Sequence, residues 1–126
     1  MSNNYIINIE SLARGILLGQ LSPSDATDQA FITASVRTEI THLFVCNTTG
    51  GALTFRLFHD VGGSTYATSN ALFYDKNVPA NDTIEIISQC LFGGIVLAPT
   101  DTLGVRSSVA NNLTFTAYGT YETKRH

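Results

Sequence analysis

Short segments in which apolar and polar residues alternate recur along the chain. In one of them, Leu53, Phe55 and Leu57 alternate with Thr54 and Arg56. Successive side chains of an extended strand point to opposite faces, so this pattern predicts a strand with one buried face. The apolar run at 43–45 lies just before it and predicts a strand that is buried on both faces.

Residues 47–51 separate these two segments and have the composition of a turn. Asn and Gly, which occur here, adopt positive φ at the lowest steric cost. We therefore predict a central β-hairpin whose strands cover residues 39–47 and 52–60.

Further strands are expected wherever apolar residues recur between turn residues. A Gly-Gly pair at 93–94 interrupts one of these segments, which predicts a β-bulge or the close approach of another backbone. Pro within two residues of Ser, Asn or Asp marks turns near residues 23, 79 and 99. The additional predicted strands cover residues 15–21, 29–36, 70–75, 83–88, 91–98, 102–109 and 113–121.

About nine short strands, with no sustained helical period, predict an all-β fold. Their spacing of roughly 8 to 12 residues is typical of an antiparallel β-sandwich, here jelly-roll-like, in a single domain. We assign residues 1–13 to an N-terminal arm, 14–122 to the sandwich domain and 123–126 to a short C-terminal tail. Within the arm, residues 6–12 are compatible with an edge strand or with one turn of helix.

The low content of charged residues favours an assembly over a free monomer. Charged residues make up 13% of the 126 residues, about half the usual share, and the only lysines are Lys76 and Lys124. Because charged residues are depleted from interface cores, we expect a homo-oligomer or a larger assembly. The alternative is a monomer with neutral polar loops.

The overall charge and hydropathy argue against two classes of partner. The net charge of −3 comes with no basic block, so we expect no binding to nucleic acid. No apolar run approaches about 18 residues, and no secretory signal begins the chain, so we expect no membrane association. These patterns predict a protein that is made in a cytoplasm and stays there or leaves inside an assembly.

No residue pattern indicates catalysis, a cofactor or a metal. His42 and Cys46 lie about 13 Å apart on one predicted strand, at roughly 3.3 Å per residue, which is too far to share a metal. His59 and Asp60 are neighbours and point to opposite faces, which does not suit a catalytic pair. Asp101 falls in a predicted turn, where Asp is favoured for turn geometry alone. We expect no enzyme activity, no cofactor and no metal, and we expect both cysteines, Cys46 and Cys90, to be buried free thiols.

The aromatic residues divide into an expected core and an expected surface. The core set is Phe31, Phe44, Phe55 and Phe115. Exposed aromatic and apolar side chains can anchor a protein interface or stack on sugar rings, although packing under loops is an equal alternative for them. The candidate interface residues are Tyr5, Ile7, Ile9, Phe58, Tyr66, Phe73, Tyr74, Tyr118 and Tyr121.

Three stretches together carry a resemblance to a known group of proteins. They are Leu-Phe-Val-Cys-Asn-Thr-Thr-Gly at 43–50, Val-Pro-Ala-Asn-Asp-Thr at 78–83 and Pro-Thr-Asp-Thr-Leu-Gly-Val at 99–105. Over residues 36–121 the chain resembles small β-sandwich virion proteins of tailed bacteriophages. It departs from their pattern at Thr100, where they have Gly, and in the glycine-broken segment before Pro99.

The resemblance implies a structural role and supplies no catalytic residues. It implies a capsid decoration, or cement, protein that resides in the virion as a homotrimer and contacts the major capsid protein. We expect the arm, residues 1–13, to reach a neighbouring subunit. The alternative function is a tail or head-fibre component, or a receptor-binding jelly roll that binds carbohydrate through Tyr66, Phe73 and Tyr74.

Overall fold

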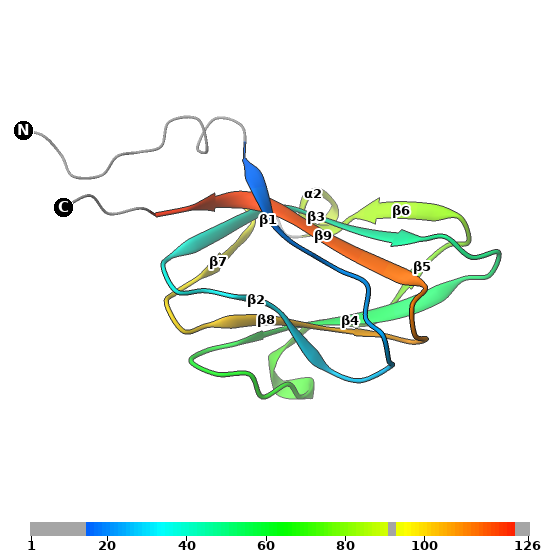
Figure 1. Cartoon of the computed structure of the whole chain (residues 1–126), viewed down its shortest axis with the longest axis horizontal. Helices are drawn as coiled ribbons and strands as arrows, with labels where there is room; N and C mark the ends of the chain where they lie inside the picture. The colour runs from blue at the N-terminus through cyan, green and yellow to red at the C-terminus, as the bar shows by residue number, and fades with distance from the viewer. Residues whose placement is uncertain (1–14, 91–92, 123–126) are drawn as a thin grey trace, which may run out of the picture.

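The computed structural model describes residues 15–90 and 93–122, and within them nine strands form two antiparallel sheets packed face to face (Figure 1). The predicted all-β sandwich is therefore confirmed. The first sheet has the order β1 (Ile16–Leu21), β9 (Leu113–Tyr121), β3 (Thr38–Asn47), β6 (Asp82–Glu85), and the short β7 (Ile95–Leu97) also pairs with β3. The second sheet has the order β2 (Gln29–Thr33), β8 (Thr102–Ser107), β4 (Leu53–Asp60), β5 (Ala71–Val78).

Most consecutive strands lie in opposite sheets. The chain passes from β1 to β2, from β2 to β3 and from β3 to β4 by crossing the sandwich each time. Only β4 and β5 are consecutive strands that pair with each other among the described residues. This strand order is that of a jelly roll, in which strands distant in sequence become neighbours.

The predicted central hairpin is wrong, because β3 and β4 belong to different sheets. β3 pairs with β6, β7 and β9, whereas β4 pairs with β5 and β8. The buried side chain of Asn47 shapes the crossing: its Nδ2 donates to the carbonyl oxygens of Gly51 at 2.9 Å and Val78 at 3.1 Å. Its Oδ1 accepts from the backbone N–H of Thr49 at 2.9 Å. These bonds hold residues 47–51 as a connection between the two sheets.

The predicted strand at 83–88 ends early, and a short helix, α2 (Ile86–Cys90), follows it. The Glu85 carboxylate accepts the backbone N–H groups of Ile87 at 3.0 Å and Ser88 at 2.8 Å, which caps this helical turn. As a result Ile86 and Ile87 are both buried, although a strand would have placed them on opposite faces.

The Gly-Gly pair at 93–94 predicted a β-bulge or the close approach of another backbone, and the close approach is found at Gly94. A Cβ on Gly94 would overlap the carbonyl oxygen of Ile40, so another backbone does approach closely here. Gly93 and Gly94 both have φ of 85°, which favours glycine. The strand beyond them, β7, is shorter than the predicted segment 91–98.

The main core lies between the two sheets and contains aromatic rings from both. Phe55 of β4 and Phe115 of β9 meet edge to face with ring centroids 5.7 Å apart, and Phe31 lies 6.1 Å from Phe115. Phe44 does not join this core, contrary to the prediction. Its neighbours Leu43 and Val45 fill the inner face of β3, so Phe44 lies half-buried on the outer face.

Candidate interaction surfaces

The outer face of the first sheet carries a cluster of exposed apolar and aromatic side chains. Leu17, Tyr118 and His42 are register neighbours on β1, β9 and β3, and Leu17 is 54% exposed and Tyr118 39%. The Phe44 ring lies 6.3 Å from that of His42 in a stacked arrangement and 6.1 Å from that of Tyr118, edge on. We call these four residues the aromatic row.

The same face has few charges. The five strands of the first sheet contain no Lys or Arg, and their acidic residues are Glu39, Asp82 and Glu85. Burial opposes ionisation of Glu85, but hydrogen bonds from Ser88 and from the backbone of Leu43 and Ile87 outweigh it and lower its pKa. The Glu85 carboxylate therefore links α2 to β3 through these hydrogen bonds. An aromatic row on a sheet face whose strands lack Lys and Arg has the composition of a surface that another protein covers.

The outer face of the second sheet is charged instead. Arg56 of β4 and Arg106 of β8 are directly opposite in register, and each is paired with an acid. Arg56 Nε lies 2.8 Å from Asp75 Oδ1, and Arg106 Nη1 lies 3.6 Å from Asp28 Oδ1. The hydrogen bond between Arg56 and Asp75 raises the pKa of Arg56 and lowers that of Asp75. The ladder Asp28, Arg106, Arg56, Asp75 crosses this sheet and is neutral as a whole.

Tyr74 is the exposed aromatic residue of this charged face. Its side chain is 49% exposed, and the guanidinium carbon of Arg56 lies 3.8 Å from its ring centroid. One face of the ring is therefore occupied by a cation–π contact.

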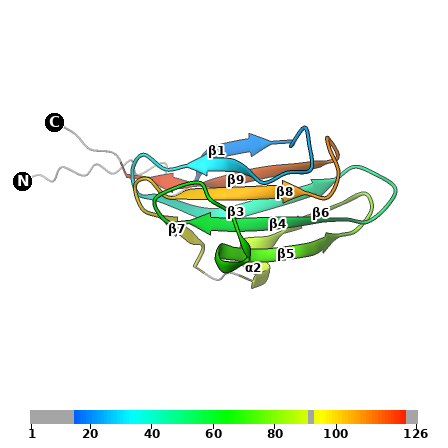
Figure 2. The same ribbon diagram turned by 90° about the horizontal axis from the view of Figure 1, so that it is seen from below.

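The β4–β5 connection covers another part of the second sheet (Figure 2), where Phe58 is buried and Tyr66 is half-buried. Phe58 is 1% exposed, which contradicts its expected position on the surface. Alternation does place it on the outer face of β4, but the ring of Tyr66 covers it at a centroid distance of 5.5 Å. The Tyr66 hydroxyl is 2.8 Å from Thr102 Oγ1, and a Cβ on Gly104 would overlap the Tyr66 ring. Burial raises the pKa of Tyr66.

Phe73 packs inward as well. It is half-buried against the main core, with its ring centroid 6.0 Å from that of Phe55. Of the six predicted interface residues that the structure describes, Tyr74, Tyr118 and Tyr121 are exposed. Tyr5, Ile7 and Ile9 lie outside the described residues.

A buried acid that sequence reasoning passed over joins three segments near one end of β4. Asp101 accepts hydrogen bonds from His59 Nε2 at 3.0 Å and from the backbone N–H groups of Gly62 at 3.1 Å and Ala98 at 3.0 Å. The bond from His59, assisted by these backbone N–H groups, lowers the pKa of Asp101. His59 and Asp101 are 42 residues apart, so nothing in the local sequence pairs them.

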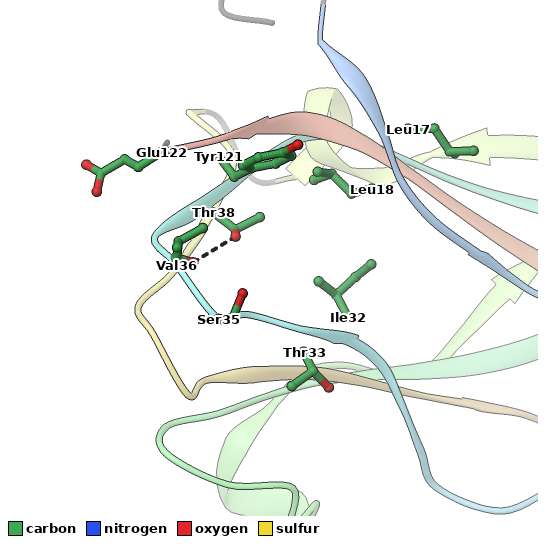
Figure 3. Close-up of a pocket in the computed structure, with 9 residues that line it drawn as sticks. All are labelled: Leu17, Leu18, Ile32, Thr33, Ser35, Val36, Thr38, Tyr121 and Glu122. Atoms are coloured by element: carbon green, nitrogen blue, oxygen red, sulfur yellow. Dashed lines mark hydrogen bonds between the residues drawn. The ribbon is translucent and has the colours of Figure 1, made fainter. Parts of the chain in front are cut away.

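An apolar groove lies between the edge strands of the two sheets, β1 and β2. It has a volume of about 510 Å³. In Figure 3, Leu18 and Ile32 project into the gap between the sheets, and Tyr121 lies across its upper side. The groove is lined by Leu17, Leu18, Ile32, Thr33, Ser35, Val36, Thr38, Tyr121 and Glu122.

Other predicted features can be placed in the described part of the chain. Cys46 is a free thiol and is half-buried rather than buried, while the side chain of Cys90 is outside what the structure describes. Residues 15–90 and 93–122 contain no group of three or more His, Cys, Asp or Glu side chains that could hold a metal ion. Over the same ranges, no helix has the length and apolar character needed to cross a membrane.

Comparison with known proteins adds one distant structural likeness. No protein-family model matches the chain, and no curated protein matches it. Among solved structures, the chain is similar to a chain in the structure of the infectious bursal disease virus Gx strain, with 14% sequence identity and a TM-score of 0.35. The match covers 98% of this chain and 35% of the viral chain, so this chain spans about a third of that chain's length. The assignment of the jelly-roll order therefore depends on this chain's own strand pairing.

Proposed function

We propose that this protein is a structural virion protein that decorates a phage capsid and binds the shell through the outer face of its first sheet. The observation that carries the proposal is the aromatic row, three of whose four residues are exposed, on a sheet whose strands contain no Lys or Arg. The phage assignment itself comes from the sequence resemblance over residues 36–121.

The first sheet is large enough to form most of a stable interface. Its strands β1, β9, β3, β6 and β7 have 6, 9, 10, 4 and 3 residues, which at ordinary strand spacings of about 3.3 Å by 4.8 Å per residue give about 500 Å² in plan. A standard specific interface buries about 800 Å² on each partner. The side chains that project from the sheet and the adjoining loops can supply the area that the plan of the sheet lacks.

The stabilising effect would come from repetition. Each copy that bridges neighbouring shell subunits adds one buried interface, and the capsid repeats this contact at every equivalent position. In this mechanism the protein adds no chemistry, and the shell resists the pressure of the packed genome because its subunits are joined by additional contacts.

Coexpression with the major capsid protein of the same genome tests the proposal. We expect the protein to co-sediment with assembled shells, and we expect Tyr118→Lys to lower the bound fraction at least tenfold, because it places an unpaired charge in the interface. Tyr74→Lys is the matched control, since Tyr74 is similarly exposed but lies on the opposite face, and it should leave binding unchanged. A wild-type protein that does not co-sediment, or two variants that bind equally, would contradict the proposal.

A carbohydrate-binding role remains the second candidate, supported by Tyr74 alone. Its exposed ring lies beside the polar groups of Arg56 and Asp75, an arrangement that suits a sugar ring. Tyr66 and Phe73 contribute little to this candidate because their rings pack against Phe58 and Phe55. Binding to a glycan array that is lost on Tyr74→Ala would favour it over capsid decoration.

A further inference from the structure

We propose that the groove between β1 and β2 binds the N-terminal arm of a second copy of this chain, with residues 5–9 added as a strand beside β1. This proposal rests on the proposed function and deepens it, because it names the contact that would hold the decorating subunits to one another.

The domain leaves apolar side chains at the margin of the groove partly uncovered. Tyr121 is 45% exposed and Val36 is 37% exposed at its margin, while Leu18 and Ile32 form its floor between the sheets (Figure 3). Its volume of about 510 Å³ lies within the range of roughly 300–1,000 Å³ found for pockets that enclose drug-sized ligands. The groove can therefore accommodate several side chains of a short peptide.

The groove also adjoins a strand edge that can accept another strand. Among the described strands, β1 pairs with β9 alone, and β2 pairs with β8 alone. The free edge of β1 thus has backbone N–H and C=O groups that no described strand uses. An extended peptide that adds to such an edge gains backbone hydrogen bonds, and its alternate side chains enter the adjoining pocket.

The arm has the residue pattern that this mode of binding requires. In an extended strand, Tyr5, Ile7 and Ile9 share one face and Ile6 and Asn8 share the other. The first nine residues carry no charged side chain, so the arm brings no charge into the apolar groove. The face formed by Tyr5, Ile7 and Ile9 would point toward Leu18 and Ile32.

A second copy suits the groove better than the chain's own arm. The arm joins the domain at β1, whose residues Leu17 and Leu18 line the groove, so its own residues 5–9 could reach the groove only after a reversal within residues 10–15. Residues 10–14 are Glu-Ser-Leu-Ala-Arg and contain none of the Gly, Pro, Asn or Asp residues that tight reversals favour, so Gly15, whose φ is 73°, is the single such residue between the arm's residues 5–9 and β1. An arm from another copy needs no reversal. Such a head-to-tail contact forms a closed ring when its rotation closes, as in a trimer.

Light scattering on the isolated full-length protein tests the arm's contribution. We expect the wild type to have a mass that is a multiple of its 13.6 kDa chain. Ile7→Asp and Val36→Asp should each reduce the mass to that of one chain, because each places a charge between the arm and the groove. Asn8→Asp is the matched control on the other face of the arm and should leave the mass unchanged. A monomeric wild type, or equal masses for Ile7→Asp and Asn8→Asp, would overturn the proposal.

Disulfide trapping between separate copies tests the location. In a background with Cys46→Ser and Cys90→Ser, an Ile7→Cys variant is mixed with a differently tagged Val36→Cys variant and oxidised. We expect a covalent dimer that contains both tags, and no such dimer when Tyr74→Cys replaces Val36→Cys. If the double variant Ile7→Cys/Val36→Cys forms the disulfide only within one chain, the arm fills its own groove and the exchange is wrong. Neither experiment uses shells, so failure of the arm contact and failure of capsid binding are recorded separately.

Discussion

At the scale of single residues, two buried polar side chains determine how loops of this sandwich are held. Asn47 bonds to the carbonyl oxygen of Val78, 31 residues away, and Asp101 bonds to His59, 42 residues away. The local sequence predicts turns at both positions, and the structure places Asn47 at the end of β3 and Asp101 just before β8. It contains no information about partners that far along the chain, so the hydrogen bonds themselves could not be predicted.

Asp101 makes the stability of the protein sensitive to acid. Its pKa is lower in the folded state than in the unfolded state, chiefly because of the hydrogen bond from His59. The ionised carboxylate therefore contributes stability that is fully present above its unfolded pKa, near pH 4, and that is lost as the pH falls through its lower folded pKa. We expect the free energy of unfolding of the wild type to fall below about pH 4.

Urea unfolding between pH 7 and pH 2.5 measures this effect. Asp101→Asn should lower the free energy of unfolding at pH 7 by about 1–3 kcal/mol, since it removes an acceptor from three part-buried donors. The variant should also lose less of its remaining stability between pH 4 and pH 2.5 than the wild type does. Glu122→Gln, at an exposed position, should follow the wild-type curve. Parallel curves for Asp101→Asn and the wild type would contradict the role of this carboxylate.

At the scale of elements, alternation identified the strands but did not assign them to sheets. A strand in either sheet of a sandwich has one buried face, so the patterns of β3 and β4 are the same for a hairpin and for a crossing between sheets. The error at Phe58 has a similar origin: alternation correctly places it on the outer face of β4, and the covering ring of Tyr66 comes from a loop. The end of β6 depended on the Glu85 side chain, which periodicity does not register.

Pairing of β9 with β3 depends on a glycine at the point of closest approach. The register between these strands shifts between Ile40 and His42, opposite Gly119 and Tyr118, and a Cβ on Gly119 would overlap the Glu39 carbonyl oxygen. Backbone cannot move aside as the end of a flexible side chain can. We therefore expect Gly119→Ala to lower the free energy of unfolding by about 3 kcal/mol or more, as severe overpacking does.

Denaturant unfolding compares this variant with Gly50→Ala. A Cβ on Gly50 would have no atom within 4 Å, so that variant should stay within about 0.5 kcal/mol of the wild type. If Gly119→Ala is as stable as Gly50→Ala, the close approach of the two strands at this bulge is not a constraint on the fold.

At the scale of the whole molecule, the jelly-roll order gathers distant parts of the chain into each surface. The groove combines residues from β1, β2, β3 and β9, and the aromatic row combines β1, β3 and β9. Composition predicted an assembly, and alternation predicted that Tyr118 faces outward, but neither could indicate that Leu17 lies beside it. The sequence contained the candidate residues, and the topology determined which of them share a face.

The same order makes the last strand indispensable, because β9 lies between β1 and β3 in the first sheet (Figure 1). Without β9, β1 loses its partner and the core loses Leu113, Phe115 and Ala117, which are all fully buried. Core truncations of one Leu and one Phe together cost about 5–10 kcal/mol, which is comparable to the whole stability of about 5–15 kcal/mol of an ordinary domain.

We therefore expect a chain that ends at Ala110 to lose dispersed NMR amide signals and cooperative thermal unfolding. A chain that ends at Glu122 retains every described strand and should keep both. Cooperative unfolding of the shorter chain would mean that the second sheet folds without the first, and the sandwich would then not be one cooperative unit.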